Sequence, residues 1–170
     1  LMLDLSLNLQ FYKYGIYPLE IRGLKGVIFS PFIHNSVKHL LSNSLPLFVL
    51  MWCLYYFYSK LANQALLLIW LLSGLFTWII GRSWHIGASG VVYSLSFFLF
   101  FSGIFRRHIP LVAVSLVVAF LYGSNVWNMF PWSVYLNASV SWEGHLSGGL
   151  SGFFIALVFL KHGPQKPKKI

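Results

Sequence analysis

The sequence predicts an all-α membrane protein, and three observations support this fold class. Of 170 residues, 58% are hydrophobic and only 9% are charged, whereas about a quarter of the residues of a soluble domain are charged. The apolar residues form long runs separated by short polar segments, as transmembrane helices require. The only cysteine, Cys53, lies inside one of these runs. The sequence therefore offers neither a disulfide framework nor a thiolate metal site.

The apolar runs predict five complete membrane spans. They cover about residues 37–58, 62–80, 87–105 (starting at Gly87 or Ser89), 109–122 and 143–160. Residues 1–10 are expected to be the outer end of a helix whose beginning is missing. Glycines and prolines interrupt residues 11–36, which we predict to be a long loop at the membrane interface, and residues 123–142 form a second loop. The domain prediction is a membrane domain over residues 1–160 and a basic tail over residues 161–170.

The distribution of positive charge predicts the orientation. The net charge is +9, but the basic residues are scattered or gathered in the tail, which favours lipid head groups and makes nucleic-acid binding negligible. Lys60, Arg106, Arg107 and the four tail lysines fall on one side of the predicted bundle, within short segments. The other five basic residues are spread over long loops. The positive-inside rule therefore places the tail in the cytoplasm.

One short motif joins a polar loop to an apolar helix. It is the segment from Gly87 to Gly90, with Ser89 at the helix start. The first turn of a helix has N–H groups without intrahelical acceptors, and flanking glycines allow another backbone to approach. This is a suitable place for a nucleophile with an oxyanion donor beside it, although small residues at this spacing in membrane helices usually serve packing.

Alternating helix direction places three polar helix starts on the same side of the membrane. His39 and Asn43 open the first span one turn apart, Ser89 opens the third, and His145 opens the fifth. Each has an ordinary explanation as a head-group residue or an interhelical hydrogen-bond partner. Together they supply a nucleophile, a base and two donors at one depth. Tyr93, one turn below the serine, is either a support for the imidazole ring or a packing aromatic.

At these residues the chain resembles the rhomboid family of intramembrane serine proteases. The matching elements are His39-x-x-x-Asn43, Gly87-x-Ser89-Gly90 with Tyr93, and His145-x-x-Gly148-x-x-x-Gly152. The resemblance covers about residues 30–155. One departure is the family's Trp-Arg pair in the long first loop, where this chain has Leu24-Lys25-Gly26-Val27.

The resemblance implies a six-transmembrane-helix bundle, with the first helix truncated or mostly missing in this chain, and a Ser–His dyad that needs no cofactor and no metal. Ser89 would be the nucleophile and His145 the general base. His39, Asn43 and the Ser89 N–H would form the oxyanion hole. Gly87, Gly90, Tyr93 and Gly148 would support the site, with His34 carried over only weakly. The implied substrates are single-pass transmembrane proteins, cut near the extracytoplasmic face of a bacterial inner (plasma) membrane.

Two other functions compete with proteolysis. A non-catalytic rhomboid-like protein would use the same small-residue faces to bind transmembrane helices. A metal-dependent enzyme or transporter would use His34, His39, His85 and His145, but the chain has no His-Glu-x-x-His helix and few carboxylates.

Overall fold

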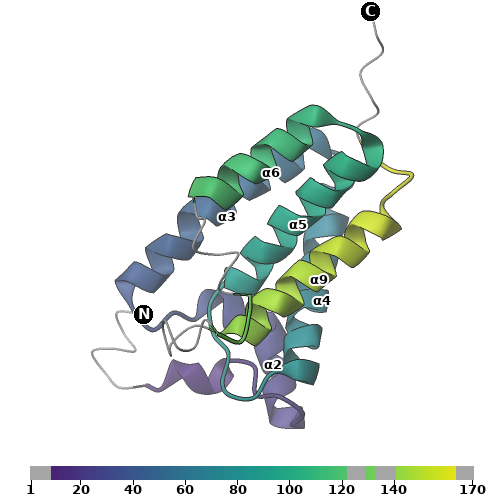
Figure 1. Ribbon diagram of the computed structural model, residues 1–170. Coiled ribbons are helices and arrows are strands. Elements are labelled where there is room, and N and C mark those ends of the chain that lie inside the picture. The colour runs from purple at the N-terminus through teal and green to yellow at the C-terminus, as the bar shows by residue number, and fades with distance from the viewer. Residues whose placement is uncertain (1–8, 122–128, 133–140, 164–170) are drawn as a thin grey trace, which may run out of the picture.

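The computed structural model describes residues 9–121, 129–132 and 141–163, and within them it confirms the all-α prediction (Figure 1). The elements are η1 (Phe11–Tyr14), α2 (Ile21–Phe29), η2 (Ser30–Phe32), α3 (Val37–Phe57), α4 (Ala62–Ile80), α5 (Ser89–Arg106), α6 (Ile109–Leu121) and α9 (Trp142–Val158). The expectations for residues 1–8, for most of the loop at 123–142 and for the end of the tail lie outside the described residues.

The five long helices begin and end within about two residues of the predicted spans. Three of them, α3, α4 and α5, are long and apolar enough to cross a membrane. Helix α9 has 17 residues and the described part of α6 has 13, at or below the usual lower limit of a span. Serine N-caps start two of the helices: Ser36 accepts from the N–H of His39, and Ser141 from that of Gly144.

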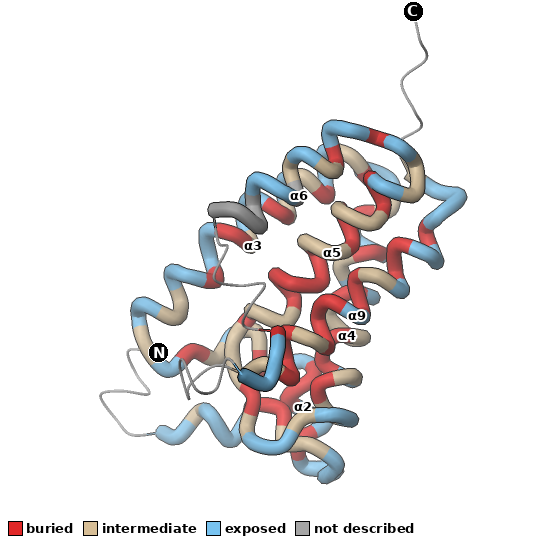
Figure 2. Tube along the Cα trace, in the orientation of Figure 1, coloured by how far each residue is buried: buried red, intermediate tan, exposed pale blue. Residues whose placement is uncertain are grey.

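Helix α5 lies at the centre of the bundle. It packs against α9, α6, α3 and α4, and buried residues follow its length and the facing side of α9 (Figure 2). Many outward-facing side chains of α3 are exposed and apolar, including Phe48, Trp52 and Tyr56, as expected of a helix surrounded by lipid. The centre of the bundle is a cluster of fully buried apolar side chains, which includes Leu50, Leu54, Ile69, Leu95, Phe98, Leu99 and Leu111.

The prediction of a simple loop over residues 11–36 is wrong in part, because α2 lies inside it. Its two glycines act as contact points: a Cβ on Gly23 would lie 1.9 Å from the Tyr17 carbonyl oxygen, and one on Gly26 would lie 2.1 Å from the Gly15 carbonyl carbon. Two indole N–H groups of α4 hold the segment, because Trp70 donates to the Val27 carbonyl and Trp78 to that of Glu20, each at 3.0 Å. These contacts anchor the loop to α4.

Helices α5 and α9 touch backbone to backbone along a strip of glycines. A Cβ on Gly148 would lie 2.3 Å from the Gly90 carbonyl oxygen, and one on Gly152 would lie 2.2 Å from that of Ser94. Within the same contact the buried hydroxyls of Ser94 and Ser151 are 2.9 Å apart. Such close approach between membrane helices is possible only where side chains are minimal.

Substitution of Gly148 by alanine is expected to destabilise the bundle by about 1–3 kcal/mol, because the added methyl group must push backbone apart. Gly149→Ala is the matched control, since its Cβ would clash only with the flexible end of the Met129 side chain and would otherwise make ordinary contact with the Phe97 ring. The measurement is the thermal unfolding midpoint in detergent micelles. An equal or larger loss for the control variant would show that the close contact does not set the stability.

Candidate active site

The loop before α5 holds Ser89 at the first position of the helix. Gly87 has a φ of +100°, a conformation that other L-residues rarely adopt, and its N–H donates to the Ser30 carbonyl at 2.8 Å. Ala88 is the N-cap, and no side chain caps the helix there. The first-turn N–H groups of α5 therefore have no intrahelical acceptors, and Ser89 itself is only partly buried.

His39 and Asn43, one turn apart on α3, both face the Gly87 backbone. A Cβ on Gly87 would lie 2.6 Å from His39 Nε2 and 3.3 Å from Asn43 Nδ2. The Asn43 side chain is buried and its Nδ2 makes no hydrogen bond in the described structure. Leaving a buried amide donor unpaired costs about 1–3 kcal/mol, so this N–H group is available to an oxygen of a ligand or of a water molecule.

The His39 ring is oriented by Asn35. Its Nδ1 lies 3.0 Å from Asn35 Oδ1, a contact that favours the tautomer with the proton on Nδ1, because an amide oxygen can only accept. A second proton on Nε2, which faces Gly87, would make the ring cationic. Of the two side chains that face Gly87, Asn43 can therefore donate a hydrogen bond without becoming charged, whereas His39 would have to become cationic to donate from Nε2.

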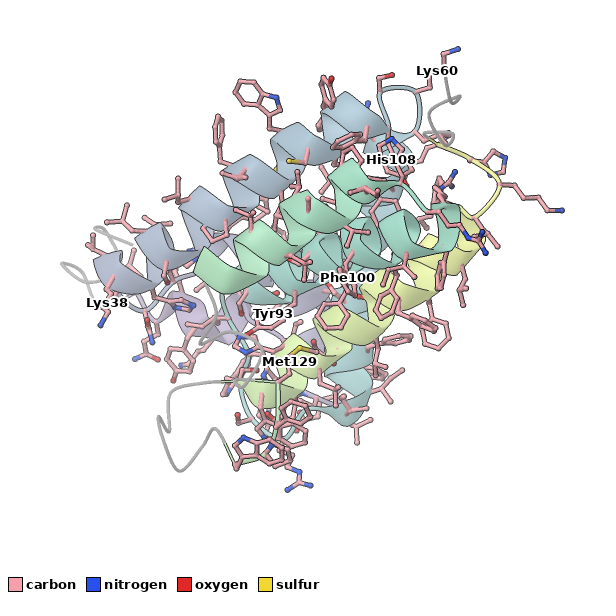
Figure 3. All side chains as sticks on the ribbon, turned by 45° about the horizontal axis from the view of Figure 1, so that its top comes forward. Lys38, Lys60, Tyr93, Phe100, His108 and Met129 are labelled. Atoms are coloured by element: carbon pink, nitrogen blue, oxygen red, sulfur yellow. The ribbon has the colours of Figure 1, made fainter. Side chains whose placement is uncertain are left out.

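His145 lies in the second turn of α9 and stacks on Tyr93 of α5. The two rings are 4.3 Å apart with an interplanar angle of 19°, and both side chains are buried. Because Tyr93 is one helical turn from Ser89 on the same face of α5, the imidazole is held against the end of α5 that carries the serine. Figure 3 shows Tyr93 inside the bundle, between the Lys38 end and the end that carries Lys60 and His108.

A small polar cavity of about 30 Å³ adjoins the start of α5. Its lining includes Ser89, Ser73, Thr77, His85 and Ser141. A cavity of this size and polarity has room for about one water molecule. The start of α5 therefore has space for one water molecule beside Ser89.

His34, which the family resemblance suggested as a further site residue, lies beside His39. Its ring is 5.0 Å from that of His39 at an angle of 72°, and its buried Nε2 has no hydrogen-bond partner in the described structure. Burial, and then the neighbouring His39, lower the pKa of His34. The lowered pKa favours the neutral form of the His34 ring beside His39.

Two residues outside the predicted dyad and oxyanion hole, one of them a histidine that the sequence marked only for the metal alternative, join the loop to α9. His85 Nδ1 is hydrogen-bonded to the Ser141 hydroxyl, and Ser141 also accepts the Gly144 N–H at 3.2 Å. A serine just before an apolar helix is a recognisable N-cap signal, so the capping role of Ser141 could have been predicted from the sequence. Its contact with His85 joins segments 56 positions apart, which no local pattern indicates.

The stability of this region is expected to depend on pH through His85. Burial lowers the pKa of His85 from 6.5 to about 4, so the folded protein holds the ring neutral while the unfolded chain takes up a proton below about pH 6.5. The free energy of unfolding should fall as the pH drops from about 6.5 toward 4, by roughly 1–3 kcal/mol. Unfolding midpoints across this range should fall less steeply in His85→Phe than in the wild type. Equal slopes in the two proteins would contradict the assignment.

The metal alternative finds no ligand set in the described residues. Among residues 9–121, 129–132 and 141–163, no three His, Cys, Asp or Glu side chains are placed to hold a metal ion. His34 and His39 are close, but His85 bonds to Ser141 and His145 stacks on Tyr93. The four histidines are thus divided among separate contacts.

Comparison with known proteins identifies the family. Residues 22–162 match the model of the rhomboid domain. Uncharacterized proteins of Mycobacterium tuberculosis and Mycobacterium bovis are each 36% identical over 159 residues, which is 89% of this chain and 65% of theirs. An uncharacterized protein of Mycobacterium leprae is 30% identical over the same share of this chain and 62% of its own. The chain thus spans slightly less than two thirds of the length of these relatives. Because the domain match covers most of its length, this chain belongs to the rhomboid family.

Proposed function

We propose that this protein is an intramembrane serine endopeptidase in which Ser89 is the nucleophile and His145 the general base. The observation that carries the proposal is the stacking of His145 on Tyr93, 4.3 Å between rings, one turn from Ser89. The glycine contact between α5 and α9 supports it, because close backbones bring a serine and a histidine within hydrogen-bond reach.

The reaction uses the chain's own side chains and one water molecule. His145 takes the proton of the Ser89 hydroxyl, and the oxygen attacks the scissile carbonyl carbon to form a tetrahedral oxyanion. Asn43 and the first-turn N–H groups of α5 donate to that oxyanion. The imidazolium protonates the leaving amine as the C–N bond breaks. Water, deprotonated by His145, then hydrolyses the acyl-enzyme and restores the serine.

The substrates in this proposal are transmembrane segments of single-pass proteins. The site lies at the starts of α3, α5 and α9, at one end of the helices, so a substrate helix has to present its end there in extended form. Lys60 and Arg107 lie in the turns at the opposite end, and the positive-inside rule assigns that end to the cytoplasm. The site would then face the extracytoplasmic side of a bacterial membrane, with residues 1–160 as the catalytic domain.

A fluorophosphonate probe tests the proposal directly. An activated serine should be phosphonylated, and mass spectrometry should locate the adduct on the peptide that contains Ser89. Chelators should not alter the labelling. Absence of labelling in a folded, monodisperse preparation would favour the non-catalytic role of binding transmembrane helices.

A further inference from the structure

The loops that lead into α5 and α9 are joined by one hydrogen bond at matching positions. His85 lies four residues before Ser89, and Ser141 lies four residues before His145. The bond joins His85 Nδ1 and the Ser141 hydroxyl. Each partner therefore stands just outside the helix end that carries one member of the proposed dyad.

His85 is held firmly on its own side of this bond. Its backbone N–H donates to the Ile16 carbonyl and its carbonyl accepts from the Ile16 N–H, both at 2.9 Å. The side chain is 4% exposed, and the ring packs on Gly81, where a Cβ would lie 2.4 Å from Nε2. The imidazole therefore has little freedom to turn away from Ser141.

Ser141 passes this constraint to α9. Its hydroxyl oxygen accepts the Gly144 N–H at 3.2 Å and so caps the first turn of the helix. A hydroxyl has one proton and two acceptor lone pairs, so the same group can cap the helix and bond to His85 at once. The residue that starts α9 is thereby tied to the loop that starts α5.

We propose that His85 is a positioning residue that acts through Ser141 to set the separation of the Ser89 and His145 helix ends. The inference rests on the proposed function and adds to it a contact outside the dyad and the oxyanion donors. The glycine strip sets how closely the two helices lie, whereas this bond sets where α9 begins relative to α5. A displacement of about 1 Å at a reacting group can cost 10²-fold in rate, so a bond of this kind acts on kcat.

The test is a double-mutant cycle on cleavage of a model transmembrane substrate. His85→Phe keeps a ring of similar size and removes the nitrogen, and Ser141→Ala removes the hydroxyl. Each variant should lower kcat about tenfold, with KM within about twofold of wild type, because the geometry of the reacting groups changes and the substrate contacts do not. The double variant should be no slower than the slower single variant, since both remove the same bond.

Two further variants separate positioning from general loss of structure. Ser141→Thr keeps the hydroxyl and should retain wild-type kcat. His108→Phe makes the same substitution at a buried histidine at the opposite end of the bundle and should also retain it. If His85→Phe fails to fold, His85→Leu takes its place in the cycle, because Ser141→Ala alone also removes the cap of α9.

Wild-type kcat in both His85→Phe and Ser141→Ala, or losses that multiply in the double variant, would overturn the inference. Those outcomes leave the proposed function intact as long as the wild type cleaves substrate and Ser89→Ala does not. If wild type and Ser89→Ala behave alike, the proposed function fails, and the positioning role falls with it.

Discussion

Replacement of Ser89 by alanine is expected to lower kcat for cleavage of a single-pass membrane substrate by about 10⁴–10⁶-fold, to the rate without a nucleophile. The physical reason is that no acyl-enzyme can form without the hydroxyl, and water alone would have to attack the carbonyl. The measurement is the rate of product formation in proteoliposomes. Ser44→Ala, at an exposed serine of α3, is the matched control and should cleave at the wild-type rate.

His145→Ala should cause a loss of similar size, because an unassisted serine hydroxyl is a poor nucleophile at neutral pH. The double variant Ser89→Ala/His145→Ala should be little slower than either single variant, since the two side chains act as one unit. His162→Ala, which alters an exposed histidine beyond the end of α9, should retain activity. Equal cleavage by wild type and Ser89→Ala would refute the protease assignment, whatever the other variants do.

Asn43→Ala is expected to lower kcat by about 10²–10³-fold, the usual cost of removing one oxyanion donor. KM should change little, because the interaction strengthens only as the oxyanion forms. The structural basis is the buried Nδ2 of Asn43, which has no partner in the described structure and lies near the Gly87 backbone. Steady-state kinetics on one substrate give both constants.

The same variant should not lose stability, which separates catalysis from folding. Removing a buried amide whose donor is unpaired also removes its desolvation cost, so Asn43→Ala should unfold at or above the wild-type temperature despite its low activity. Asn63→Ala, at the opposite end of the bundle where Asn63 accepts from Tyr55, is the control and should keep wild-type kcat. A strongly destabilised Asn43→Ala protein would instead assign this residue to packing.

The long helices could be predicted from the sequence because the hydrocarbon of a membrane restricts which residues can cross it. A segment that crosses hydrocarbon must be apolar over about 20 residues, and the polar interruptions at Lys60, at residues 81–88 and at Arg106 therefore mark the helix ends closely. The same rule makes a polar residue at a helix start conspicuous, which singled out His39, Asn43, Ser89 and His145. Their catalytic roles come from the family resemblance and stay predictions.

Helix α2 was not predicted from the sequence, because its glycines were interpreted as signs of a loop. Gly23 and Gly26 normally interrupt a helix, but here they allow α2 to lie against residues 15–17. Helix α4 holds α2 in this position, because its tryptophans donate to the carbonyls of Val27 and Glu20. A close approach between separate parts of the chain leaves no periodic signal in the sequence.

Local patterns in the sequence were enough to establish the membrane class, the long helices and the polar residues at their ends, because each follows from how a short segment partitions between lipid and water. The sequence left Tyr93 as either a support for the imidazole ring or a packing aromatic, and the structure stacks it on His145. The unpaired amide of Asn43 beside Gly87 and the bond between His85 and Ser141 emerged only when the helices were packed together. Such contacts depend on distances between segments far apart along the chain, and those distances are set by side-chain volume and backbone approach across the whole bundle.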